Sequence, residues 1–452
     1  MNKPHRTSGE IAPLDREALE SFWLPFTPNR QFKADPRLFV AAEGMHYVTS
    51  DGRRILDAMA GLWCVNAGHG QRAIVDAIKA QAERLDFVSS FQMSHPAAFE
   101  LAGRIAEIAP TGLDHVFFTN SGSEAVDTAL KIARAYHRTR GEGSRIRFIG
   151  RAKAYHGMGW GGLSVSGLGR HRRDFGPLLP EVDHLSHTHS IEHAAFSRGQ
   201  PQWGAHLADE LTGLLQIHDP STVAAVIVEP VTGSGGVLPP PVGYLEQLRA
   251  ICNRHGILLI FDEVITGFGR LGAAFGAEAF GVTPDLITCA KGMTNGAVPM
   301  GGVIASRSVY DALMAGPSNV IELFHGYTYS AHPLACAAAL ATLDVYRDLE
   351  LFARCRRLAP IWERTAHALR DAPHVVDIRN IGLLAAIDLA PRDGAPGARA
   401  AECAKRCFDD GVLIRNSGDT LVLSPPLIIA EDEIEMVFAT IRRALDAVGR
   451  RD

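Results

Sequence analysis

Two apolar runs of this chain each lead into a residue that could act on a small molecule. The run at residues 257–261 is followed by Asp262, and the run at 286–290 is followed by Lys291. Because ligands of open α/β sheets bind at the carboxyl ends of the strands, we expect this carboxylate and this amine to meet in one cleft. Each residue alone has a simpler interpretation, since an Asp after a strand is often a helix cap and a Lys is usually solvated.

A third segment has the features of an anion site. The run at 115–118 leads into Ser121, Gly122 and Ser123, and a helical pattern begins near Glu124. Free backbone N–H groups and the helix dipole favour an anion at such a turn, although simple N-capping explains it equally well. Taken together, the amine, the carboxylate and the anion site match pyridoxal phosphate (PLP), which needs a Lys for its Schiff base, a carboxylate opposite its ring nitrogen and a cradle for its phosphate.

The elements that position these residues have an α/β pattern. Short apolar runs typical of strands buried on both faces occur at 115–118, 146–149, 223–228, 257–261, 286–290 and 302–305. Amphipathic helical patterns lie between them, as at 125–137 and 244–255. This alternation predicts a parallel sheet.

Beyond His332 the pattern changes to that of an α+β domain. Helices are predicted at 334–347, 351–369, 398–410 and 431–447. Short strands are predicted around Ile378, at 384–388, around Leu413 and at 421–423. A chain of 452 residues suits such a division into a large and a smaller domain.

The composition limits the partners. A net charge of −5 provides no basic field for nucleic acid, so small-molecule substrates are expected. Residues 1–6 have no apolar targeting segment, and no stretch approaches the roughly 20 apolar residues of a membrane span, so we expect a cytoplasmic protein that does not enter a membrane. The odd number of cysteines, without CxxC spacing, predicts reduced thiols at Cys64, Cys252, Cys289, Cys336, Cys355, Cys403 and Cys407.

A histidine cluster raises the question of a metal. It comprises His184, His187, His189 and His193. No carboxylate or cysteine accompanies these residues at ligand spacing, and Ser and Thr interrupt them, so we expect no metal.

Several ordered motifs resemble the class III aminotransferases. They are Thr119-Asn120-Ser121-Gly122-Ser123-Glu124, Tyr155-His156-Gly157, Val228-Glu229-Pro230, Asp262-Glu263-Val264, Ala290-Lys291-Gly292 and the run from His325 to Pro333. Within that class, Trp23 to Thr27, Ala60 to Cys64, and Arg415 ahead of Gly418 resemble the ω-amino acid:pyruvate (β-alanine:pyruvate) aminotransferases.

The resemblance implies the PLP fold type I, with active sites at the subunit interface of a homodimer or tetramer. It implies a large PLP-binding domain at 61–330, a C-terminal small domain at 331–452, and a segment at 1–60 that packs with the small domain. The expected reaction moves an amino group from an ω-amino acid or amine to pyruvate, giving alanine.

The resemblance also implies a role for each residue of the site. Lys291 carries the cofactor and Asp262 pairs with its ring nitrogen. Further cofactor-binding residues are Ser121, Gly122, Ser123, Tyr155, His156, Glu229, Val264 and, from the partner subunit, Thr328. Arg415 clamps the pyruvate carboxylate. The other substrate-binding residues are Trp63, Tyr155, Phe26 and Leu62.

Two positions depart from related enzymes of the class. Ornithine and 4-aminobutyrate aminotransferases carry a Glu that pairs with the substrate-binding Arg, and here Ser234 takes that place. Val422 stands where some β-alanine:pyruvate enzymes have Gln near the substrate, so the resemblance does not extend to β-alanine as the preferred donor.

Two other functions share part of this pattern. A PLP decarboxylase or aminomutase of the same fold would keep Lys291 and Asp262, but the pairing of Trp63 with Arg415 argues against it. A non-catalytic phosphate-binding protein would need only the turn at residues 121–123, and such a protein would take up no PLP.

Overall fold

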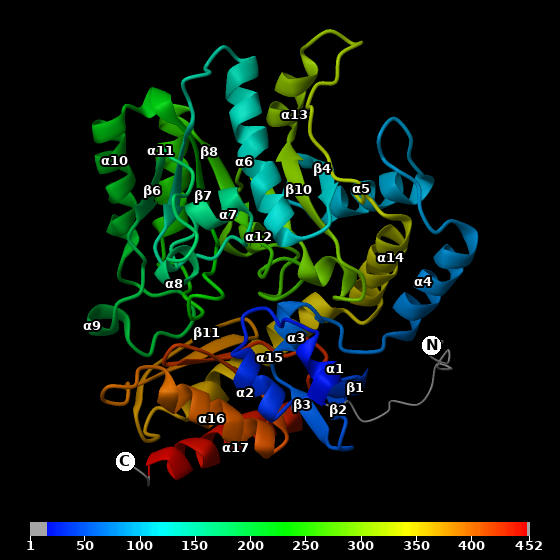
Figure 1. Ribbon diagram of the computed structural model, residues 1–452. Coiled ribbons are helices and arrows are strands. Elements are labelled where there is room, and N and C mark those ends of the chain that lie inside the picture. The colour runs from blue at the N-terminus through cyan, green and yellow to red at the C-terminus, as the bar shows by residue number, and fades with distance from the viewer. Residues whose placement is uncertain (1–15, 450–452) are drawn as a thin grey trace.

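The computed structural model describes residues 16–449, and Figure 1 shows an upper and a lower part. Residues 1–6, considered above for a targeting segment, lie outside the described residues. The upper part is built around a seven-stranded sheet, and the lower part contains the first strands and the last helices. Helix α14 (Pro333–Asp348) packs against α4 (Arg72–Arg84) and α5 (Pro96–Ile108) above and against α15 (Leu351–His367) below, so it connects the two parts.

The seven-stranded sheet has the order β4-β10-β9-β8-β7-β5-β6. Its strands are β4 (Leu113–Thr119), β5 (Arg147–Arg151), β6 (Val182–Leu185), β7 (Val223–Val228), β8 (Leu258–Asp262), β9 (Leu286–Cys289) and β10 (Gly301–Ser306). All six predicted strands are confirmed, and β6, a short strand with polar residues, was not predicted. The sheet is mostly parallel, as expected, but β10 runs antiparallel to both β9 and β4.

Successive side chains of the central strands pack into two different hydrophobic clusters, one on each face of the sheet. Phe148 and Ile260 pack with the buried face of α6 (Gly122–Thr139), and Ile149 and Leu259 pack in the cluster that contains the buried residues of α11 (Tyr244–His255). The sheet is therefore covered on both faces, as its apolar runs predict. The prediction of α11 was correct at both ends, and α6 begins three residues earlier than predicted.

Shorter helices complete the upper part. They are α7 (Trp160–Val165), α8 (Gly169–Arg172), α9 (Ile191–Ala194), α10 (Glu210–His218), α12 (Gly276–Phe280), α13 (Arg307–Met314) and the 3-10 helices at Ala205–Asp209, Pro220–Thr222 and Lys291–Thr294. The first helices of the described chain are α1 (Arg16–Glu20), α2 (Asn29–Ala34) and α3 (Ala60–Trp63).

The lower part contains two four-stranded sheets. One has the order β11-β12-β15-β14 and is antiparallel, with β11 (Val375–Ile381), β12 (Leu384–Leu389), β15 (Thr420–Leu423) and β14 (Arg415–Ser417). The other has the order β1-β2-β3-β13, with β1 (Phe39–Glu43), β2 (His46–Thr49), β3 (Arg54–Asp57) and β13 (Val412–Leu413). Because β3 pairs parallel to β13, the beginning and the end of the chain share one sheet. Helices α15, α16 (Ala398–Asp409) and α17 (Glu431–Gly449) cover these sheets, and every strand and helix predicted for this region is present.

Two further expectations concern the whole chain. Within residues 16–449, the helices are all too short or too polar to cross a membrane. The cysteines carry free thiols, and six of the seven are buried.

Candidate functional site

Three chain segments with the predicted functional residues meet at one edge of the large sheet. Strands β8 and β9 are parallel neighbours, so Asp262 and Lys291 emerge at the same edge. The antiparallel β10 begins there and pairs its Gly301 with Thr119, the last residue of β4. The turn at residues 121–123 therefore joins the other two segments, although it is distant from them in sequence.

Lys291 has an amine with no hydrogen bond or ion pair among the described residues. Burial lowers the pKa of this amine and Arg415 lowers it further, while Cys64 and Asp262 act in the opposite direction. Its Nζ atom lies 5.5 Å from the ring centroid of Trp63. The amine is thus available to bind a group or to carry a proton.

Asp262 is buried and accepts three hydrogen bonds. Its Oδ2 atom lies 2.7 Å from Nδ1 of His156, and its Oδ1 atom accepts from the Val264 N–H at 3.2 Å and from the Thr288 hydroxyl at 3.1 Å. A carboxylate acceptor places the proton of His156 on Nδ1, which leaves Nε2 as a buried atom without a partner in residues 16–449. His156 thus orients the carboxylate.

Glu229 supports the loops around the site. It is buried, its carboxylate accepts from the backbone N–H of Tyr155 at 2.9 Å and of Gly233 at 2.8 Å, and burial raises its pKa. We therefore assign Glu229 to positioning Tyr155 and the loop that contains Ser234. The neighbouring Glu263, which the sequence analysis did not single out, is fully buried, receives the N–H groups at the start of α12, and has its pKa raised by burial to about 7.

The start of α6 is an N-terminus with free N–H groups. Ser121 caps the helix by accepting from the Glu124 N–H at 3.2 Å, and Glu124 accepts from the Asn120 N–H at 2.7 Å. The N–H groups of Gly122 and Ser123 have no acceptor among the described residues. A Cβ atom on Gly122 would lie 2.9 Å from the Val264 side chain, so only glycine allows this close approach. Capping by Ser121 therefore leaves the next two N–H groups free for an anion.

These features fit the PLP that the sequence predicts. The site combines an amine without a partner, a carboxylate held by donors, and two free N–H groups at the start of an 18-residue helix. The donors and acceptors are therefore of the kinds that PLP needs for its aldehyde carbon, its ring nitrogen and its phosphate.

The predicted substrate-binding residues lie on several elements of this region. Trp63 is buried and its Nε1 atom has no partner in the described chain, whereas Phe26 and Leu62 are exposed. Burial raises the pKa of Tyr155, which is also raised by Asp262 and lowered by Arg415. Tyr155 thus lies within electrostatic reach of both a cofactor residue and the predicted carboxylate clamp.

Arg415 projects from β14, the edge strand of its sheet. Its guanidinium makes no ion pair or side-chain hydrogen bond with the described residues, and partial burial lowers its pKa. The residue is nonetheless exposed in the single chain. Nearby, the Ser417 hydroxyl donates to the Ser234 carbonyl at 3.1 Å, so the loop that contains Ser234 borders β14. Val422 pairs with Arg415 in the sheet, and its side chain is buried in a cluster with Trp63.

Two further residues near this region are Thr328 and His171. Thr328 is exposed, and its hydroxyl makes no hydrogen bond within the described chain. His171, which the sequence analysis missed, contacts both Phe26 and Tyr155 through its ring. The basic run from Arg170 to Arg173, shortly after the Tyr155 motif, was the feature of the sequence that could have pointed to His171.

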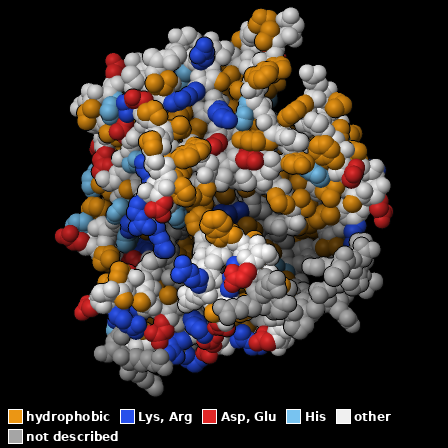
Figure 2. Space-filling view, in the orientation of Figure 1, with side chains coloured by type: hydrophobic (Ala, Val, Ile, Leu, Met, Phe, Trp, Pro, Cys, Tyr) orange, Lys and Arg blue, Asp and Glu red, His pale blue; other side chains and the backbone are white. Residues whose placement is uncertain are grey.

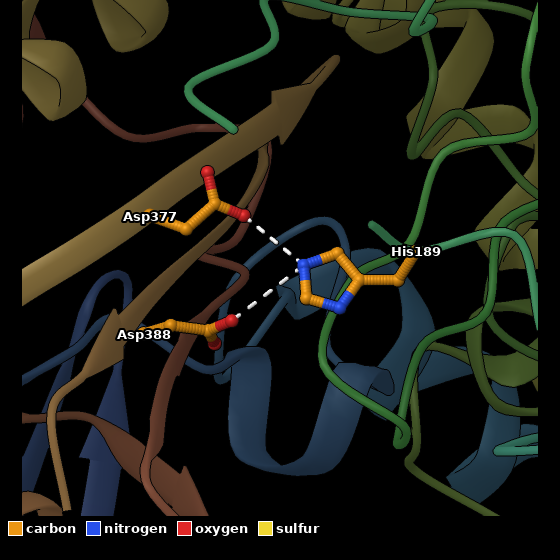
Figure 3. Close-up of side chains that lie close together, drawn as sticks. All are labelled: His189, Asp377 and Asp388. Carbon is orange, nitrogen blue, oxygen red and sulfur yellow. Dashed lines mark hydrogen bonds and ion pairs between the residues drawn. The ribbon is translucent and has the colours of Figure 1, made fainter. Parts of the chain in front are cut away.

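One residue of the histidine cluster, His189, lies beside two carboxylates. Figure 3 shows His189 directed at Asp377 and Asp388, and the three could offer ligand atoms within 4.8 Å of one another. Both carboxylates belong to β11 and β12, almost 200 residues away, so sequence spacing around the histidines could not reveal them.

Arg379 already occupies the centre of this cluster. Its guanidinium pairs with Asp377 and with both carboxylate oxygens of Asp388, at 2.7 and 2.9 Å, and also contacts His189. Burial alone would raise the pKa of Asp377, but His189 and Arg379 lower it to about 2. Arg379 also donates to the Gly236 carbonyl at 2.9 Å. We interpret the cluster as an ion-pair network that fixes the loop near Ser234.

Comparisons with known proteins find relatives over almost the whole chain. The family model "Aminotransferase class-III" matches residues 29–445. An omega-aminotransferase of Caulobacter vibrioides is 60% identical over 95% of this chain and 98% of its own length. A beta-alanine–pyruvate aminotransferase of Pseudomonas aeruginosa is 48% identical over 99% of this chain and 100% of its own.

A solved structure confirms the fold. The PLP-bound amine transaminase of an uncultivated Pseudomonas species superimposes with a TM-score of 0.87 and 35% identity, over 95% of this chain and 99% of that one. The predicted PLP fold type I, with its large α/β domain, is therefore confirmed.

Proposed function

Because the chain belongs to the class III aminotransferases, which depend on PLP, we propose that it transfers an amino group from an ω-amino acid or a simple amine to pyruvate. The products are alanine and an aldehyde, a ketone or an oxo acid. The observation that carries the proposal is the unpaired guanidinium of Arg415 beside Tyr155, in electrostatic reach of Lys291. Arg415 would bind a carboxylate close to Lys291, the residue that would carry the cofactor.

The residues at the sheet edge hold the cofactor in this proposal. Lys291 would bind it covalently, and Asp262, oriented by His156, would pair with its ring nitrogen. Tyr155 and Val264 would contact its ring. The free N–H groups of Gly122 and Ser123, at the start of the helix that Ser121 caps, would bind its phosphate. Bound PLP supplies an electron sink that weakens the C–H bond next to the donor nitrogen.

Lys291 moves the proton in this reaction. Because burial lowers its pKa, the freed amine is neutral more readily than an exposed lysine, and a neutral amine can accept a proton. Lys291 would be the residue that accepts the proton leaving the substrate carbon. Asp262 would stabilise the protonated form of the cofactor's ring nitrogen.

Arg415 and the surrounding aromatic residues select the substrates. Arg415 binds the carboxylate of pyruvate or of an ω-amino acid through two parallel hydrogen bonds. Ser234 leaves this arginine without the carboxylate partner found in ornithine and 4-aminobutyrate aminotransferases. Trp63, with Tyr155, Phe26 and Leu62, contacts the remainder of the substrate, which suits donors that lack a carboxylate near the amine.

We further propose a homodimer, or a tetramer built from it, with Thr328 reaching the partner's phosphate site. Figure 2 shows hydrophobic side chains gathered on the upper and right-hand part of this face, over α13, β4 and α5. Large exposed apolar residues in α13 and α5 and in the segments next to them are Phe91, Met93, Phe99, Tyr310, Met314, Val320, Ile321 and Phe324. Exposed apolar residues gathered on one face are typical of a protein interface. Sedimentation equilibrium of the holoenzyme tests this assembly.

The division of the chain into domains is part of the same proposal. We assign 61–330 to the large domain, 331–452 to the small domain, and 1–60 to an N-terminal segment whose described residues, from 16 onward, pack with the small domain. The parallel pairing of β3 with β13 supports the last assignment.

A single-turnover survey tests the activity. The PLP form is mixed separately with β-alanine, 4-aminobutyrate, taurine and an arylalkylamine, and the loss of cofactor absorbance is recorded. We expect bleaching by at least one donor, and recovery of the absorbance with formation of alanine when pyruvate is added. Release of carbon dioxide, or an amino group shifted within the donor, would instead indicate a decarboxylase or an aminomutase.

A further inference from the structure

His171 lies in the substrate half of the site, where the proposed function gives it no role. It belongs to α8, and its ring centroid lies 5.4 Å from that of Tyr155 and 5.4 Å from that of Phe26. The interplanar angles of 73° and 63° are those of edge-to-face contacts, a favourable arrangement for aromatic rings. The ring is therefore held between two of the residues that we assign to the substrate.

The two ring nitrogens of His171 have different surroundings. Nδ1 is shielded from solvent and has no hydrogen-bond partner in residues 16–449. Nε2 is not shielded in this way, and no described residue bonds to it. A proton on Nδ1 would be a buried donor without an acceptor, which is unfavourable. A proton on the accessible Nε2 can instead be donated to water or to a ligand, so we assign the neutral ring this tautomer.

The charges around the ring favour this neutral form. Burial lowers the pKa of His171, and the cations of Arg170 and Arg415 lower it further. Arg170 is its neighbour on α8, and Arg415 approaches from β14. The other two rings in contact with it, Phe26 and Tyr155, carry no charge at neutral pH, and burial raises the pKa of Tyr155.

We propose that His171 is a second substrate-binding residue, whose neutral Nε2–H donates a hydrogen bond to the substrate carboxylate held by Arg415. The inference rests on the proposed function, because it assumes that Arg415 binds this carboxylate. The cation of Arg415 and the neutral donor of His171 together suit an enzyme that accepts substrates with and without a carboxylate. A second cation would repel ammonium donors that lack a carboxylate, whereas a neutral N–H can return to water when no carboxylate is present.

Two variants of the holoenzyme separate hydrogen bonding from packing. His171→Phe keeps an aromatic ring between Tyr155 and Phe26 but removes the donor, and His171→Gln keeps an N–H donor near the position of Nε2. For the pyridoxamine form with pyruvate, we expect kcat/KM to fall about 10-fold to 100-fold in His171→Phe. His171→Gln should recover most of this loss. For the PLP form with an arylalkylamine, the effect of His171→Phe should be much smaller. Equal losses in both half-reactions, or no loss with pyruvate, would overturn the inference.

A binding measurement provides a readout without turnover. Calorimetric titration of the PLP form with propionate, an unreactive carboxylate, should show a weaker affinity in His171→Phe by a similar factor. In two buffers of different ionisation enthalpy at pH 7.5, the wild type should take up almost no proton on binding. Uptake of one proton that disappears in His171→Phe would contradict the neutral donor.

The same titration distinguishes this inference from the proposed function. If Arg415→Ala leaves propionate binding unchanged, the carboxylate site itself is wrong. If Arg415→Ala abolishes binding while His171→Phe matches the wild type, the site stands and only the role of His171 is refuted.

Discussion

Arg415→Ala tests whether one site serves substrates with and without a carboxylate. The substitution removes the guanidinium from the edge strand β14, and its backbone pairing with Val422 can remain. Because Arg415 makes no ion pair with the described residues, no internal partner loses its charge compensation. Any effect on the reaction therefore reports the substrate rather than a broken network.

The structure sets the expected size of this effect. Two opposite charges about 4 Å apart interact by about 4 kcal/mol at an effective dielectric constant near 20. Removing one partner of a desolvated pair costs about 2–5 kcal/mol. Since Arg415 is exposed in the single chain although its pKa is lowered by partial burial, we expect the lower end of this range, about 2–3 kcal/mol. This corresponds to a roughly 30-fold to 150-fold loss of kcat/KM.

Stopped-flow absorbance of the two half-reactions measures the loss of kcat/KM in Arg415→Ala. The pyridoxamine form with pyruvate should show the full loss, and the PLP form with an arylalkylamine should change by less than about threefold, because this donor has no carboxylate. Arg415→Lys is the matched control, which keeps the charge but loses the bidentate fork, and should have an intermediate rate with pyruvate. If Arg415→Ala slows both half-reactions equally, the residue is structural and the carboxylate binds elsewhere.

Further substitutions test the remaining assignments. Lys291→Ala should abolish turnover in a coupled alanine assay, because it removes both the covalent anchor and the proton carrier; near-normal rates would refute the assignment. Asp262→Asn should still bind PLP, as seen by absorbance, but lose at least about 100-fold in kcat, since an amide does not keep the ring nitrogen protonated; equal activity would remove Asp262 from this role. Ser234→Glu should raise the KM for pyruvate by pairing with Arg415, and an unchanged KM would show that the two side chains do not meet. The folded-state pKa of Asp377, about 2, lies below its usual value of 3.8, so its stabilisation is present above about pH 4 and is lost as the pH falls towards 2. Denaturant unfolding at pH 6 and pH 3 should show a smaller difference in Asp377→Asn than in the wild type.

Local patterns in the sequence were sufficient for the sheet and its functional edge. A strand buried on both faces must be apolar throughout, so β7 and β8 were recognisable without any knowledge of their neighbours. Asp262 and Lys291 follow such strands directly. Because parallel strands end at the same edge of a sheet, their convergence could be predicted from their position alone.

Strands with little apolar character were not predictable in this way. The edge strand β14 contains Arg-Asn-Ser, and its pairing with β15 depends on the neighbouring chain rather than on its own periodicity. The reversed direction of β10 is likewise a property of its pairing with β9 and β4. The sequence shows how a segment folds locally, but not which partner it meets.

The sequence by itself determined the apolar strands, the helices and the chemistry at the strand ends, because these depend on residues adjacent in the chain. Only the tertiary structure decided that His171 packs between Phe26 and Tyr155. It also decided that Arg379 joins His189 to carboxylates of two later strands. These contacts join residues up to almost 200 positions apart. A local pattern of hydrophobicity or spacing depends only on neighbouring residues, so it does not specify which distant side chains come together when the chain packs.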